Sequence, residues 1–141
     1  MSANIDATDE RIIRILQEDS RKAFVDIANE IGLSESAVRR RVKNLVESGI
    51  IKRFTLELGA SDKTSAITLI SVSSTADTSA VSSRLMKLPG IEVVYEITGQ
   101  YDIATIIAAP AIAEINKCID DIRKIEGVSD TNTVIILKTM K

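Results

Sequence analysis

Residues 24–49 have the sequence FVDIANEIGLSESAVRRRVKNLVESG, and this stretch decides the fold of the first part of the chain. Its apolar residues recur at helical spacing on both sides of Gly32, which suits the left-handed end of a helix. Ser34 is a good N-cap for the second helix, which ends at Gly49. The pattern therefore predicts two helices joined by a short turn. Their apolar stripes comprise Phe24, Ile27, Ala28 and Ile31 in the first, and Val38, Val42 and Leu45 in the second.

A further helix is expected upstream of this pair. Ile12, Ile13 and Leu16 fall on one helical face, and Asp6 or Thr8 is available as the N-cap. Three helices thus fit into residues 1–50, which we interpret as a helix-turn-helix domain of the winged-helix-like kind.

After Gly49 the apolar pattern changes from a helical period to the alternation of strands. We expect a strand at 51–58, a polar linker at 59–65 and a second domain at 66–141. The order of its elements is βαββαβ, as in a ferredoxin-like fold built from two βαβ halves, so the whole chain is predicted to be α+β. The expected strands cover 67–73, 91–97, 101–107 and 128–137, and the expected helices cover 78–88 and 111–125.

Short glycine turns support the repeat. Each predicted helix of the second domain is followed by the same kind of turn, and Thr98-Gly99-Gln100 is expected to join the two central strands tightly. The two turns after the helices are Leu88-Pro89-Gly90-Ile91 and Ile125-Glu126-Gly127-Val128.

Composition limits the chemistry that the chain can perform. It has 141 residues, 45% hydrophobic and 27% charged, which is enough for the core of a globular protein. With no histidine and only Cys118, it lacks the residues for a Cys/His zinc site, a Ser-His or Cys-His nucleophile, or an internal disulfide. Cys118 lies in a helical apolar pattern and is expected to be buried. We therefore expect no enzyme, no metal and no resident cofactor.

One short segment is basic inside an acidic protein. Residues 34–53 carry six lysines and arginines against two glutamates, although the pI of the whole chain is about 5.2. On a helical wheel the apolar stripe lies opposite Ser36, Arg39, Arg40 and Lys43. A helix-turn-helix presents its second helix to the major groove of DNA in this way. Double-stranded DNA is therefore the expected partner, and the scarcity of aromatic residues disfavours single strands.

The DNA hypothesis assigns roles along this helix. Base edges would be reached by Ser36, Ala37 and Arg40. Phosphates would be held by Arg39, Arg41 and Lys43, and by the positive helix end at Ser34. An ordinary solvated helix face is the alternative, because Glu35 and Arg39 can pair at i, i+4. Arg40 and Lys43 have no comparable partner in the pattern.

The ordered set of motifs resembles the Lrp/AsnC, or feast/famine, family of transcriptional regulators. Residues that match the N-terminal half of the family are Asp6, Asp9, Ile12-Ile13, Leu16-Gln17, Ser20-Arg21, Ile27-Ala28, Ile31-Gly32-Leu33-Ser34, Val38, Arg41-Val42, Leu45 and Gly49-Ile50-Ile51. Residues that match its C-terminal amino-acid-sensing domain are Leu88-Pro89-Gly90-Ile91, Thr98-Gly99-Gln100-Tyr101-Asp102, Gly127-Val128, Thr131 and Thr133. The resemblance covers nearly the whole chain.

Self-association is expected from the strands of the second domain. Ile67 and Leu69 alternate with Ile70 and Val72, so both faces of the first strand are apolar, and the last strand has the same property. Helices would cover one face of the sheet, and we expect a second copy to cover the other. The resemblance likewise implies sheet-to-sheet dimers that often assemble further, commonly to octamers.

The turn between the two central strands is the candidate effector site. An amino acid offers a carboxylate to backbone N–H groups near Gly99 and an ammonium group to Asp102. The resemblance implies that this turn lines the effector pocket, because a G-x-[YF]-D pattern does so in the family. From the residues alone, a simple hairpin at Gly99 and a solvated carboxylate at Asp102 are the better explanation, and it is the resemblance that favours an effector site here. The candidate residues are Gly99, Gln100, Tyr101, Asp102, Thr131 and Thr133.

The sequence thus predicts a sequence-specific DNA-binding regulator that responds to an amino acid or a related small molecule. Two alternatives stay open. One is an architectural DNA-binding protein with no effector, and the other is an enzyme like the haem-pathway decarboxylases that resemble the same family but use histidine. No stretch approaches the roughly 18 apolar residues of a membrane span, and early acidic residues disfavour a signal peptide. We expect a cytoplasmic, nucleoid-associated protein with no membrane partner.

Overall fold

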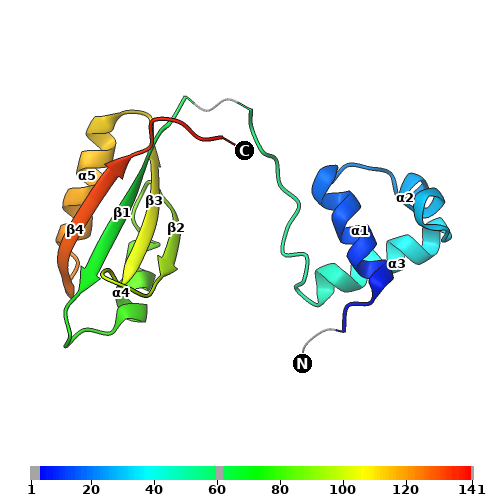
Figure 1. The fold of residues 1–141 in the computed structure, drawn as a ribbon, viewed down its shortest axis with the longest axis horizontal. Coiled ribbons are helices and arrows are strands. Elements are labelled where there is room, and N and C mark those ends of the chain that lie inside the picture. The colour runs from blue at the N-terminus through cyan, green and yellow to red at the C-terminus, as the bar shows by residue number, and fades with distance from the viewer. Residues whose placement is uncertain (1–3, 60–61, 141) are drawn as a thin grey trace. The chain divides into compact units, whose positions relative to one another are not determined.

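The computed structural model describes residues 4–59 and 62–140 of the chain. The chain divides into two compact units, Met1–Gly59 and Ala60–Lys141 (Figure 1). Residues 60 and 61 of the predicted linker lie outside the described residues. None of the helices in the described ranges is long and apolar enough to cross a membrane.

Three short helices form the first unit, with the caps that the sequence predicts. Asp6 caps the first helix by accepting a hydrogen bond from the Asp9 N–H. Gly32 ends the second with a φ of 76°, and Ser34 caps the third by accepting from the Ala37 N–H. The helices are α1 (Ala7–Glu18), α2 (Phe24–Ile31) and α3 (Glu35–Glu47).

The core of this unit lies where the three apolar stripes meet. Helices as short as α2, with eight residues, are marginal in isolation, so burial of these stripes supplies most of their stability. Ala28 is small enough to let α2 approach its neighbours closely, and it is 2% exposed. The buried cluster comprises Ile12, Leu16, Ile27, Ala28, Val38 and Val42.

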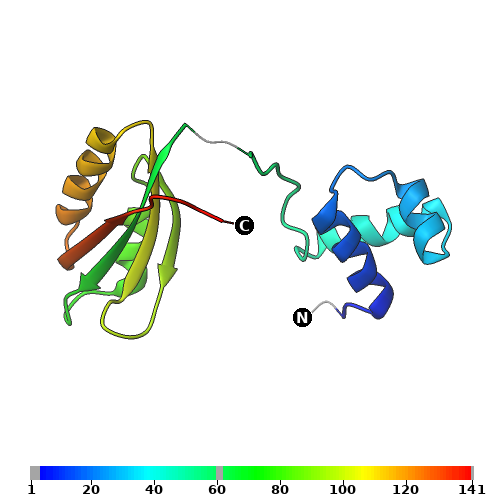
Figure 2. The same cartoon turned by 45° about the horizontal axis from the view of Figure 1, so that its top comes forward.

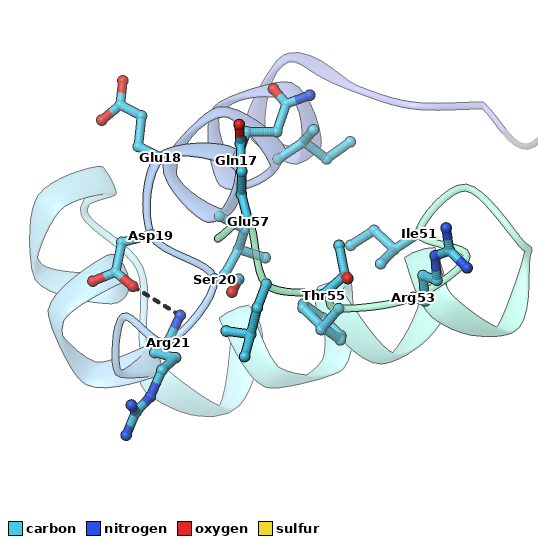
Figure 3. Close-up of a pocket in the computed structure, with 13 residues that line it drawn as sticks. Gln17, Glu18, Asp19, Ser20, Arg21, Ile51, Arg53, Thr55 and Glu57 are labelled. Atoms are coloured by element: carbon cyan, nitrogen blue, oxygen red, sulfur yellow. Dashed lines mark hydrogen bonds between the residues drawn. The ribbon is translucent and has the colours of Figure 1, made fainter. Parts of the chain in front are cut away.

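The strand predicted at 51–58 is wrong. This segment is irregular, and it lies beside the C-terminal end of α1 (Figure 3). Together with the turn after α1, it borders a cavity of about 550 Å³. Within that turn, the Arg21 N–H donates to Asp19 Oδ1 at 2.9 Å. A strand requires a hydrogen-bonded neighbour, and no strand within the described residues pairs with this one. Ile51 packs against the core, whereas Phe54 and Leu56 are exposed.

The second unit is the predicted ferredoxin-like fold. Its four strands are antiparallel in the order β2-β3-β1-β4, and α4 and α5 lie on the same face of the sheet (Figures 1 and 2). The elements are β1 (Thr64–Val72), α4 (Thr78–Leu85), β2 (Ile91–Glu96), β3 (Ile103–Ala109), α5 (Ile112–Arg123) and β4 (Val128–Ile135).

One face of the sheet forms the core with both helices, and the turn before β4 is fitted closely to it. Gly127 has a φ of 99°, and a Cβ atom there would lie 2.8 Å from the Cβ of Ala76. The turn before β2 has a counterpart in Gly90, with a φ of 90°, as the predicted repeat requires. The buried core comprises Ala66, Ile70, Val81, Leu85, Ile103, Ile107, Ala109, Ile115, Cys118, Ile119 and Ile122.

The opposite face of the sheet is apolar, and neither α4 nor α5 covers it. Ile67 is in register with both Ile106 and Val134, which puts the three side chains in one row. Leu69 continues this face one pair along β1, and Val134 is 50% exposed. We call Ile67, Leu69, Ile106 and Val134 the open face.

Candidate nucleic-acid interface and effector site

The outward side of α3 carries the predicted cationic face. Val38 and Val42 are buried against the other helices, so the residues about half a turn away point into solvent. The exposed residues of this side are Ser36, Arg39, Arg40 and Lys43, which we call the cationic face.

Neighbours hold two of the cations in place. Arg39 Nη2 donates to Glu35 Oε1 at 2.6 Å, as predicted, and its guanidinium carbon lies 5.1 Å from the centre of the Phe24 ring. Lys43 Nζ lies 3.8 Å from Glu47 Oε1, so the expectation that Lys43 has no partner is wrong. Both ion pairs are exposed and contribute only a few tenths of a kcal/mol, so a phosphate can replace either glutamate.

Arg40 is exposed and forms no ion pair with any residue in 4–59 or 62–140. It is one turn from the N-terminal end of α3, where Ser34 Oγ lies 3.2 Å from Ser36 Oγ. The Ala37 side chain is half-buried beside them. The structure therefore groups the candidate base-reading residues at the first turns of one helix.

Arg41, in contrast, does not lie on the cationic face. Its Nη1 atom donates to Asp6 Oδ2 at 2.8 Å and to Asp9 Oδ1 at 2.9 Å, at the start of α1. The hydrogen bond from the Asp9 N–H and then the Arg41 guanidinium lower the pKa of Asp6. Position on the helical wheel separates Arg41 from Arg40, but no pattern in the sequence names partners more than thirty residues away.

The candidate effector turn lies between β2 and β3. Gly99 has a φ of 110° and open space around it, and Gln100 is exposed. The Tyr101 hydroxyl accepts a hydrogen bond from Asn132 Nδ2 at 3.3 Å. Asn132 is absent from the predicted set. It is two residues before Val134 on β4, so strand alternation could have placed it on the open side of the sheet beside this turn.

Asp102 is half-buried and holds this turn to the rest of the sheet. Its Oδ2 atom accepts from the Val72 N–H at 2.7 Å, and its own N–H donates to the Ile70 carbonyl at 3.0 Å. The Ile97 N–H in turn donates to the Asp102 carbonyl. Within the described residues, the second carboxylate oxygen, Oδ1, accepts no hydrogen bond and is available to a ligand.

The hydroxyls of Thr131 and Thr133 do not lie beside the candidate effector turn. Thr131 Oγ1 accepts from Arg123 Nε of α5 at 3.1 Å, and Thr133 Oγ1 lies 2.8 Å from the hydroxyl oxygen of Thr68, which is fully buried. Both hydroxyls therefore lie on the helix-covered side of the sheet, whereas Tyr101 contacts the other side.

Cys118 is 5% exposed, as predicted, and lies at a cavity of about 260 Å³ between α5 and the end of β3. Burial, and secondly the charge of Asp121, raise the pKa of the Cys118 thiol. A protonated, buried thiol is a weak nucleophile, which agrees with a packing role.

Both units match domains of known proteins. Residues 5–46 match the AsnC-type helix-turn-helix domain, and residues 65–141 match the Lrp/AsnC ligand binding domain. The chain is 44% identical over 138 residues to the HTH-type transcriptional regulator LysM of Saccharolobus solfataricus, covering 98% of this chain and 97% of that protein. It is 39% identical over 144 residues to the HTH-type transcriptional regulator FL11 of Pyrococcus furiosus, covering 100% of this chain and 95% of that protein.

The fold is also similar to that of solved structures. A feast or famine regulatory protein from M. tuberculosis, complexed with L-methionine, superposes with a TM-score of 0.88. The sequence identity is 23%, and the match covers 98% of this chain and 95% of that one.

Proposed function

Because the chain belongs to the Lrp/AsnC family of transcriptional regulators, we propose that residues 1–50 bind duplex DNA through α3 and that residues 66–141 bind an amino-acid effector and a second copy of the chain. Residues 51–65 connect these two functions. Its relatives at 39–44% identity are transcriptional regulators, and this chain is not an enzyme. A regulator of this kind acts on the DNA in the cytoplasm.

The observation that carries the DNA proposal is the cationic face on a helix whose other side is buried. In a helix-turn-helix, the second helix enters the major groove while the first crosses the backbone. Arg40 then reaches base edges, with Ser36 and Ala37 beside it, and a guanine is its best partner. Arg39 and Lys43 hold phosphates. The α3 N-terminus at Ser34 is suited to a further phosphate.

The effector proposal rests on the turn between β2 and β3. Backbone N–H groups around Gly99 and Gln100 are suited to the carboxylate of an amino acid, and Asp102 Oδ1 is suited to its ammonium group. Tyr101 and Asn132 add polar groups at the same end of the open face. Thr131 and Thr133 have no part in this proposal because their hydroxyls bond within the covered side. The L-methionine bound to the M. tuberculosis regulator supports this ligand class.

Self-association is proposed through the open face. Its apolar row of Ile67, Ile106 and Val134 lies on the face away from α4 and α5, and burying such a row against a second copy is favourable. A two-fold dimer also matches two DNA half-sites to two copies of α3. We propose the dimer as the minimal unit, with further assembly to octamers.

The test uses the full chain and a duplex enriched by it from a random pool. A gel shift with and without a panel of amino acids should show a retarded complex and a change in its affinity or size with one class of amino acid. Specific binding that responds to no amino acid would identify an architectural DNA-binding protein. Absence of binding to any duplex would overturn the DNA proposal.

A further inference from the structure

Arg41 joins the middle of α3 to the start of α1 by hydrogen bonds to Asp6 and Asp9. All four carboxylate oxygens of these two residues accept a hydrogen bond. Asp6 and Asp9 form a reciprocal capping box, in which Asp6 Oδ1 accepts from the Asp9 N–H and Asp9 Oδ2 accepts from the Asp6 N–H. The remaining oxygens, Asp6 Oδ2 and Asp9 Oδ1, both accept from Arg41 Nη1. We call Asp6, Asp9 and Arg41 the clamp.

The clamp withdraws Arg41 from DNA. Arg41 follows Arg39 by two residues, which is about 200° around a helix, and it lies beside the buried stripe. Its side chain is 28% exposed, against 64% for Arg39 and 71% for Lys43. Two carboxylates face its single positive charge, so the clamp as a whole is negative and would repel a phosphate.

The clamp is also placed to fix the rotation of α3 about its axis, and with it the orientation of the cationic face. The core holds α3 against α1 through apolar contacts, which have no preferred direction, whereas two charged hydrogen bonds from one nitrogen are directional. Arg40 directly precedes Arg41 on α3, so a rotation of the helix that broke the clamp would also move Arg40 relative to the groove.

We infer that Arg41 is a positioning residue that fixes α3 on the α1 capping box and does not itself contact DNA. The inference rests on the proposed DNA-binding function and deepens it. The expected change in DNA affinity on loss of an acidic group therefore has an unusual direction. Removing the negative charge of Asp9 should weaken specific DNA binding, although loss of an acidic group ordinarily strengthens binding to a polyanion.

The experiment compares four variants of the full chain with the parent: Asp9→Asn, Arg41→Gln, Arg41→Lys and Glu10→Gln. Glu10 lies in the same helical turn as Asp9, is exposed and forms no ion pair within the described residues, so it is the matched control. Affinities are measured by fluorescence anisotropy against the enriched duplex and a random duplex, each over a series of salt concentrations. Circular dichroism and thermal unfolding check that each variant is folded.

The expected result is an approximately three- to tenfold loss of affinity for the enriched duplex in Asp9→Asn and Arg41→Gln. Binding to the random duplex and its salt slope should stay at parent values in Arg41→Gln, because the cations that neutralise phosphates are all still present. Glu10→Gln should bind both duplexes as well as the parent or better. Arg41→Lys should retain most of the specific affinity, because one ammonium nitrogen can replace Nη1.

Tighter binding by Asp9→Asn, or a reduced salt slope and equal losses on both duplexes in Arg41→Gln, would overturn the inference and make Arg41 a phosphate-binding residue. If Arg41→Gln does not fold, Asp9→Asn still shows whether loss of the acidic group weakens or strengthens specific binding. Arg41→Lys still shows whether another cation at this position retains the specific affinity. Failure of the parent and Glu10→Gln to bind either duplex is a different outcome, since it overturns the DNA-binding function on which the inference rests.

Discussion

Asp102 Oδ2 accepts a hydrogen bond from the Val72 N–H at 2.7 Å, which ties the turn between β2 and β3 to the end of β1. The register between β1 and β4 shifts at Ser71 and Val72, so this N–H lies where the regular strand pairing is interrupted. One oxygen of Asp102 thus stabilises the sheet while the other is available to the proposed effector.

The two roles of Asp102 can be separated by two substitutions. Asp102→Asn keeps an oxygen for the Val72 N–H but removes the charge that pairs with an ammonium group, so it should abolish the amino-acid response in calorimetry and keep a near-parent unfolding midpoint. Asp102→Ala should in addition lose about 1–3 kcal/mol of unfolding free energy in urea, because a half-buried N–H is left without its acceptor. Undiminished ligand affinity in Asp102→Asn would move the ammonium site elsewhere.

Dimerisation through the open face is tested by Val134→Asp. A carboxylate in the row formed by Ile67 and Val134 would be buried without a partner in the dimer, at a cost of several kcal/mol. Sedimentation equilibrium at micromolar concentration should therefore show a monomer. Leu137→Asp is the control, because Leu137 lies beyond β4 and is 95% exposed, and it should sediment like the parent. An unchanged dimer in Val134→Asp would place the interface elsewhere.

The turn before β4 should tolerate no side chain. Gly127→Ala introduces both an unfavourable positive φ and a clash with the Cβ of Ala76, whereas Gly99→Ala introduces only the first. The positive φ costs about 1–2 kcal/mol, and overpacking adds about 1–3 kcal/mol. Denaturant unfolding should therefore find Gly127→Ala less stable than Gly99→Ala by the overpacking cost of about 1–3 kcal/mol. Equal stabilities would mean that the helix and turn relax without cost.

The Cys118 thiol should react slowly in the folded protein. Burial raises its pKa, so the thiolate that attacks iodoacetamide is scarce at pH 8, and its 5% exposure limits access as well. Alkylation followed by mass spectrometry should be much slower in buffer than in urea, where the thiol is exposed. Equal rates in both conditions would show that the helix α5 opens readily around this residue.

Local periodicity and caps are sufficient to predict most elements of both units. The apolar stripe ending at Gly32 and the cap at Ser34 define the helix-turn-helix because these signals act within one or two turns of chain. The glycine turns at Gly90 and Gly127 likewise mark the repeat of the second unit.

Contacts between distant segments are what the sequence does not predict. Arg41 binds Asp6 across 35 positions, which no local pattern encodes. Because β4 has apolar residues on both faces, its alternation does not tell which face the helices cover, so the sequence alone does not separate the Thr131 and Thr133 hydroxyls from the turn. The segment at 51–58 has the composition of a strand but lacks a pairing partner within the described residues.

The central claim, that the cationic face of α3 reads duplex DNA, is tested most directly by Arg40→Ala and Lys43→Ala against the enriched and random duplexes over a salt series. Arg40→Ala should cost about 1–3 kcal/mol on the enriched duplex only, whereas Lys43→Ala should weaken both alike and make the salt slope less negative by about one for each phosphate that is no longer neutralised. The parent slope itself should be several units negative despite the acidic pI. A parent slope near zero, with both variants binding as the parent does, would contradict the claim.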